Sequence, residues 1–203
     1  MRLRLKLSEM TLKSNLIAGL AAALIAAGCA KQAAPVPDVD PMSAEGAASV
    51  SATVASLASA SDSAGIARYL EKACGAAAVR SQCYESQLVP LARDGKVKVA
   101  MGALGEIAAV DPAVRNDGHV YAHAIGIAAG QSTENVAQAF MQCSEAFQSG
   151  CYHGTIQAWF ARLDSIGAPE ANALCEPFRA DDSQRWLRFQ CVHGMGHGLT
   201  TLN

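Results

Sequence analysis

Several signatures are absent from this 203-residue chain, and each absence argues against a class of protein. The chain has a formal charge of −2 and no basic patch after residue 28, which argues against a nucleic-acid partner. No C-x-x-C-H motif occurs, so covalent haem attachment is not expected. No C-x-x-C pair occurs either, which disfavours an oxidoreductase with a labile disulfide. Alternation of apolar and polar residues is scarce, so strand-rich folds are disfavoured.

Apolar residues instead recur with the spacing of α-helices through most of the chain after residue 64. Pro112, Gly150 and Pro169 interrupt this pattern between the helical segments, as expected where short helices fold back on one another. The sequence therefore predicts an all-α fold of short helices stacked as α-hairpins. The helical segments include "DSAGIARYLEKAC", "KVKVAMGALGEIAAV", "TENVAQAFMQCSEAF", "GTIQAWFARLDSIG" and "SQRWLRFQCVHGMGHGL".

The N-terminal segment is typical of a secretory signal peptide. The apolar run "NLIAGLAAALIAAGC" (15–29) follows Lys13, ends in small residues and is too short to span a membrane comfortably. We therefore expect residues 1–28 to be removed. Met10 is an alternative start, because the sequence from Met10 onward is already a complete signal.

The end of this segment, "IAAGC" (25–29), resembles the lipobox of bacterial lipoproteins. The resemblance covers only these residues and implies that Cys29 is lipidated and becomes the new N-terminus. It places the protein in the cell envelope, anchored to a membrane through lipid and facing the periplasm or the exterior. The alternative is an ordinary signal peptide with a chance cysteine.

Residues 29–63 are rich in Ala, Ser and Pro and contain no aromatic residue, which predicts a tether. Residues 64–203 are long enough for one compact domain. The sequence stops at "GLTTLN", directly after its densest motif. We therefore expect either a partner protein or a missing C-terminal part to cover the last helix.

A degenerate repeat supports the stacked hairpins. The fragments "QCYES", "GCYHG" and "QCVHG" occupy equivalent places, and "HVYAHAIG" (119–126) is a further copy without cysteine. The copies recur every few tens of residues. Such a period is typical of stacked α-hairpins, each of which buries its apolar face against its neighbour.

The cysteines indicate disulfide bonds. Seven cysteines less Cys29 leave six, an even number in an oxidising compartment. The repeat favours pairing between neighbours, and the alternative is a Cys-x-His metal motif. The predicted pairs are Cys74 with Cys83, Cys143 with Cys151, and Cys175 with Cys191.

All five histidines lie within the motif segments, which suggests a metal site. Two pairs have the spacing HxxxH, which places both rings on one face of a helix. Glycine or alanine follows four of the five histidines, leaving room for a neighbouring helix or a bound group. The predicted ligands of a transition metal (copper, zinc or iron) are His119, His123, His153, His193 and His197.

The alternative is that these histidines are structural and bond backbone carbonyls, with Gly194 and Gly198 serving tight helix packing. Neither HxxxH pair contains the glutamate of zinc proteases, and no ExxH pair supports a di-iron bundle. No strand precedes "HGMGHG", so a nucleotide cofactor is not expected. The leading hypothesis is a metal-binding lipoprotein, compatible with a redox or hydrolytic role. The second is a non-catalytic helical scaffold that recruits a protein partner.

Overall fold

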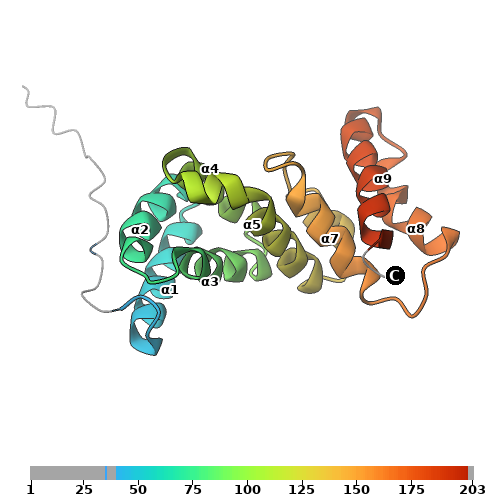
Figure 1. Cartoon of the computed structure of the whole chain (residues 1–203). Helices are drawn as coiled ribbons and strands as arrows, with labels where there is room; N and C mark the ends of the chain where they lie inside the picture. The colour runs from blue at the N-terminus through green and yellow to red at the C-terminus, as the bar shows by residue number, and fades with distance from the viewer. Residues whose placement is uncertain (1–34, 36–39, 201–203) are drawn as a thin grey trace, which may run out of the picture. The chain divides into compact units, whose positions relative to one another are not determined.

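The computed structural model of the chain describes Pro35 and residues 40–200, with the side chains of 197–200 left out. The signal peptide, the alternative start Met10 and the lipidation site Cys29 lie outside the described residues. Within the described part the chain forms helices and turns and no strand (Figure 1). The predicted all-α fold is confirmed.

Nine α-helices and two short 3₁₀ helices make up this part of the chain. Their bounds are α1 (Ala44–Ser59), α2 (Ser63–Gly75), α3 (Arg80–Arg93), α4 (Val97–Val110), α5 (Pro112–Gln131), α6 (Val136–Phe140), α7 (Gly150–Phe160), α8 (Ala168–Cys175), η1 (Glu176–Phe178), η2 (Asp182–Gln184) and α9 (Arg185–Thr200).

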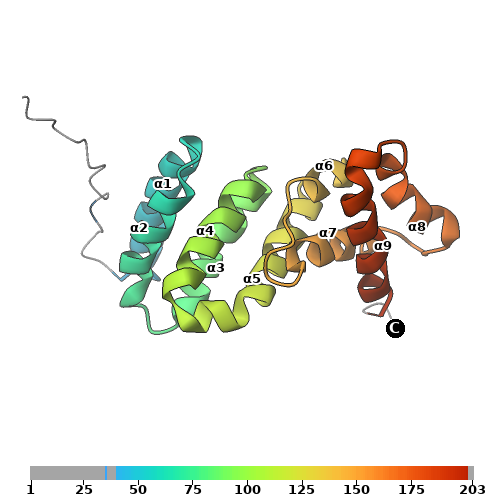
Figure 2. The same cartoon turned by 90° about the horizontal axis from the view of Figure 1, so that it is seen from above.

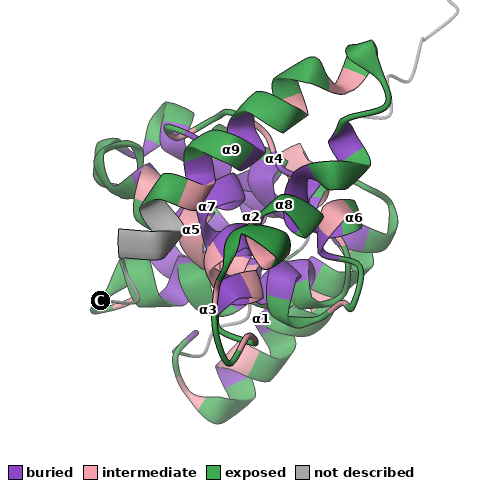
Figure 3. Ribbon diagram, turned by 90° about the vertical axis from the view of Figure 1, so that its right-hand side faces the viewer, coloured by how far each residue is buried: buried purple, intermediate pink, exposed green. Residues whose placement is uncertain are grey.

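The helices form consecutive hairpins that pack in chain order (Figure 2). The pairs α2/α3, α4/α5, α6/α7 and α8/α9 are the hairpins, and α1 packs on α2 and α3. The second helices of the hairpins contact one another in the series α3, α5, α7 and α9, and the contact between α5 and α7 is the most extensive. Their buried faces point toward these contacts, whereas the outward faces are exposed (Figure 3). The predicted stack of α-hairpins is therefore present.

Helix α1 lies inside the segment that the sequence predicted as a tether. Val50, Val54 and Ala58 are buried and stand four residues apart, so they form one apolar stripe against the next helices. Ser43 caps the helix by accepting a hydrogen bond from the backbone N–H of Gly46. The prediction was wrong for residues 44–59, because alanine and serine are compatible with a helix when valines supply the buried side.

Three disulfides connect neighbouring helices, as predicted. The Cα–Cα distances are 5.6 Å for Cys74–Cys83, 5.5 Å for Cys143–Cys151 and 5.8 Å for Cys175–Cys191. In each, the second cysteine lies in the second helix of a hairpin, and the first lies at or just after the end of the first helix. Each bond therefore holds the two arms of one hairpin together.

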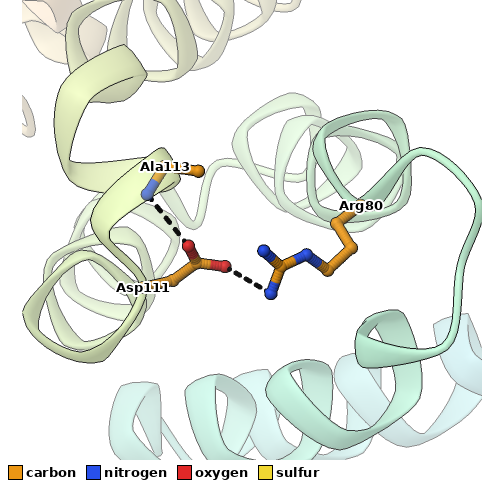
Figure 4. Close-up of polar contacts among 3 residues, drawn as sticks. All are labelled: Arg80, Asp111 and Ala113. Carbon is orange, nitrogen blue, oxygen red and sulfur yellow. Dashed lines mark hydrogen bonds and ion pairs between the residues drawn. The ribbon is translucent and has the colours of Figure 1, made fainter.

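The α4/α5 hairpin carries no cysteine, and a buried aspartate at its turn caps α5 and pairs with the preceding hairpin (Figure 4). Asp111 accepts a hydrogen bond from the backbone N–H of Ala113 at 3.0 Å and so caps α5. Its other carboxylate oxygen lies 3.1 Å from the guanidinium of Arg80, at the start of α3. This ion pair joins the turn between α4 and α5 to the preceding hairpin.

In the part of the chain that the structure describes, no helix combines the length and the apolar character needed to cross a lipid bilayer.

Candidate functional site

Four histidine rings from three helices form a continuous row. His119 and His123 of α5 have ring centroids 6.0 Å apart, and the ring of His119 lies 5.6 Å from that of His153 in α7. The ring of His153 lies 5.7 Å from that of His193 in α9. The structure thus brings together four of the five predicted ligands, and the side chain of the fifth, His197, lies outside the described part.

The row follows from the repeat and the stacking. His119, His153 and His193 each stand near the middle or first half of the second helix of successive hairpins. Helices α5 and α7 run in the same direction, because His119 lies opposite Gly150 and His123 lies opposite Gly154. Stacking equivalent helices in parallel places equivalent side chains next to one another, so a histidine repeated in sequence becomes a row in space.

Glycines allow the helices of this region to approach closely. A Cβ atom on Gly126 would meet the carbonyl oxygen of Cys151, and one on Gly154 would meet that of His123. A Cβ on Gly194 would meet the side chain of Ile156 in α7. The glycines beside the histidines therefore serve tight packing, as the alternative interpretation expected for Gly194. The same close packing brings the imidazoles of different helices into contact.

The loop before α7 is strained and touches His119. Phe147, Gln148 and Ser149 have φ angles of +56°, +55° and +63°, a left-handed conformation that is uncommon for residues other than glycine. The Cys143–Cys151 disulfide closes this loop. Strained backbone of this kind persists only where the surroundings enforce it, and it is frequent at functional sites.

This loop selects the tautomer of the His119 ring. The carbonyl oxygen of Phe147 lies 3.0 Å from Nδ1 of His119. A carbonyl can only accept, so Nδ1 carries the proton and donates it. Nε2 of the neutral ring is then the nitrogen with the lone pair. Histidines that bind metals commonly donate their other N–H to a carbonyl in this way.

The environment of His123 favours its neutral form. Burial lowers the pKa of His123 below its usual value, and the neighbouring ring of His119 lowers that pKa further. Neutral imidazole is the form that binds a metal ion. His153 is buried, with 8% of its surface exposed, which limits the access of water to the middle of the row.

At the α9 end the row continues into exposed aromatic rings. Phe189 is stacked on His193 with ring centroids 5.9 Å apart, and Trp186 is stacked on Phe189 at 5.4 Å. Trp186 and Phe189 are 52% and 57% exposed, and Val192 beside them is 53% exposed. His193 is also exposed, so this end of the row is accessible to solvent.

The described rings do not form a closed coordination shell. Over the described residues, no group of three or more His, Cys, Asp or Glu side chains is placed to hold a metal ion. The histidines are adjacent in pairs instead. The alternative thiolate ligands are excluded by the disulfides, because Cys151 and Cys191 are both bonded to other cysteines.

Sequence reasoning missed the role of Phe147. The ring of Phe147 lies where a Cβ on Gly118 would be, so a glycine next to His119 makes room for it. The short span between Cys143 and Cys151 was the signal of a constrained loop, but it does not show which carbonyl faces a histidine. Comparison with protein-family models, with curated proteins and with solved structures found no match to this chain.

Proposed function

We propose that this chain is a cell-envelope lipoprotein whose helical-hairpin domain binds a transition metal through histidines of α5, α7 and α9. The observation that carries the proposal is the row of four imidazoles at ring-centroid distances of 5.6 to 6.0 Å. The five histidines of the chain all lie on these three helices. A set of imidazole donors suits copper, zinc or iron.

Two features support binding over mere packing. The Phe147 carbonyl orients His119 so that Nε2 has an available lone pair, and the lowered pKa of His123 keeps that ring neutral. The residues that would hold the ion are His119, His123, His153 and His193, with His197 following one turn after His193 on α9. A bound ion would supply Lewis-acid or redox chemistry there.

Elemental analysis tests the proposal. The full chain, expressed into a bacterial periplasm without a histidine tag, should retain about one equivalent of transition metal through gel filtration, because ligands on packed helices need little reordering. The double variant His119→Ala, His153→Ala should lose the metal while its circular dichroism stays helical. Gln138→Ala, a polar change on an exposed position of α6, is the control and should keep the metal.

The second candidate is a scaffold that recruits a protein partner. It is favoured by the exposed Trp186 and Phe189 of α9. Metal content near zero after the protein has been offered copper, zinc and iron would contradict metal binding and favour this alternative. The double histidine variant would then lose stability and no metal.

The anchoring part of the proposal rests on the lipobox residues and has a separate test. The wild-type chain should be found in the membrane fraction and should require detergent for release. Cys29→Ser should become soluble, because the site of lipid attachment is lost. Release of the wild type by high salt alone would contradict the lipid anchor.

A further inference from the structure

We infer that the histidine row transfers a monovalent d¹⁰ ion, Cu⁺ or Ag⁺, between His193 and the His119–His123 pair by way of His153. The inference rests on the proposed metal binding and specifies its ligand class and its use. Its starting observation is that the histidines are arranged as successive pairs, and that each pair shares one histidine with the next.

The spacing of each pair suits one ion held between two rings. A metal–nitrogen bond of about 2.0 Å places the ion about 3.2 Å from the ring centroid. Two rings on one ion then have centroids about 5.2 Å apart at a tetrahedral angle and about 6.4 Å apart when linear. The three observed distances, 6.0, 5.6 and 5.7 Å, all lie within this interval.

Pairs of nitrogen donors select the class of ion. Zinc in proteins is almost always held by four ligands, or by three plus water. The described histidines offer no group of three around one point. Cu⁺ and Ag⁺ accept as few as two nitrogen donors, so each described pair is sufficient for one of these ions, whereas zinc would need ligands beyond the pair.

The burial of the rings indicates transfer. His193 is exposed, His153 in the middle is buried, and His119 and His123 are half-buried. A buried ligand between two more accessible ends is expected of a path. The end at His119 is the better holding site, because the bond to the Phe147 carbonyl fixes the orientation of that ring and leaves Nε2 as its ligating nitrogen.

The transfer consists of two ligand exchanges. An ion held by His193 and His153 would exchange His193 for Nε2 of His119, the bond to His193 lengthening as the bond to His119 forms, so that two rings hold the ion before and after the step. The ion then binds His123 as the bond to His153 breaks. The rings remain neutral and the ion keeps its charge, so no electron or proton has to move.

The test measures two quantities in the full-length protein: the rate at which an ion is taken up (loading) and the affinity at equilibrium (holding). Silver ions, which need no reductant, are offered at equilibrium, and Cu⁺ is delivered anaerobically from a coloured chelator so that loading can be followed in time. X-ray absorption of the loaded wild type should show about two nitrogen ligands. His193→Ala should slow loading by at least about tenfold and weaken equilibrium binding less than that.

His123→Ala should show the opposite pattern to His193→Ala: equilibrium binding should be weakened by at least about tenfold, and loading should be slowed less. His153→Ala should slow loading as strongly as His193→Ala does. Gln138→Ala, on an exposed position of α6, is the control that should change neither quantity. Each variant is first shown to keep the wild-type helical signal.

Other results would overturn the transfer row in distinguishable ways. Equal loss of binding in His193→Ala, His123→Ala and His197→Ala would indicate one closed site, and metal binding itself would stand. Tight binding of zinc with four ligands and no binding of silver would also indicate one closed site. Failure to bind any metal ion would overturn both the row and the proposed function.

Discussion

The first half of the hairpin stack (α1 to α4) and the second half (α5 to α9) pack their helices together through different residues. Helices α2, α3 and α4 bury large aliphatic and aromatic side chains such as Leu70, Tyr84 and Leu104. Between α5 and α7 they are made by glycines whose missing Cβ atoms leave room for the backbone of the opposite helix. One interface is mediated by side chains and the other by backbone.

The two halves also differ in what they bury. Thr155, at the contact of α5 with α7, has its hydroxyl 3.2 Å from the carbonyl oxygen of Gly126 and 3.0 Å from that of Cys151. His153 is buried nearby, and all histidines of the chain lie in this half. Buried polar groups are destabilising unless they are bonded, so an apolar interface would be simpler for stability alone. The first half also buries a polar side chain, Gln87 of α3, so the feature that distinguishes the second half is a buried histidine.

The largest expected effect comes from removing a disulfide in each half. Cys143→Ala with Cys151→Ala, and Cys74→Ala with Cys83→Ala, should each lower the free energy of unfolding by about 3 kcal/mol, because the closed loops are similar in length. Urea denaturation without reductant measures this. Only the first double variant should also weaken metal binding, since it releases the strained loop that holds His119. Equal effects on metal binding would remove the functional distinction between the halves.

The second effect tests the backbone-mediated interface. Gly154→Ala should destabilise the protein by about 2–3 kcal/mol, because the new Cβ would overlap the carbonyl oxygen of His123 and the two helices would have to separate. Gly105→Ala in α4 is the matched control: nothing lies within 4 Å of its Cβ position. That variant should be stabilised by up to about 1 kcal/mol, the helix preference of alanine over glycine. Thermal unfolding compares them, and equal losses would contradict the tight interface.

The sequence predicted what depends on local pattern and failed where tertiary geometry decides. Helical periodicity gave the hairpins, and the repeat gave the cysteine pairs, because both are short-range features. The helix α1 was missed, since its stripe of Val50, Val54 and Ala58 is short and set among residues typical of linkers. The spacing of His119 and His123 placed them on one face, but their pairing with His153 depends on how closely α5 and α7 approach. The contact of Phe147 with His119 depends on a loop conformation that no pattern encodes.

The third effect concerns the hairpin that has no disulfide. Asp111→Ala should destabilise the protein by about 1–2 kcal/mol, because α5 loses its N-cap and Arg80 loses its partner. Most of the loss is assigned to the cap, since the side chain of Arg80 is 49% exposed and exposed ion pairs contribute little. Asp117→Ala, on an exposed position of α5, should stay within about 0.5 kcal/mol of wild type. A larger loss from Arg80→Ala than from Asp111→Ala would contradict this assignment.

The smallest expected effect is a pH dependence that belongs to the second half alone. The pKa of His123 is lowered in the folded state from a value of 6.5, by burial first and by His119 second. As the pH falls below 6.5 the unfolded chain takes up a proton at His123 before the folded protein does, so the unfolded state is favoured. The free energy of unfolding therefore falls as the pH is lowered from 6.5 to the folded pKa of His123, and this contribution is fully lost below that pKa.

His123→Gln should show a smaller fall in urea midpoint between about pH 7 and pH 5 than the metal-free wild type. Glutamine suits the position, because Gln157 follows His153 on α7 at the same interval as His123 follows His119 on α5. Nuclear magnetic resonance titration of the His123 ring checks the sign directly, and a pKa above 6.5 would contradict it.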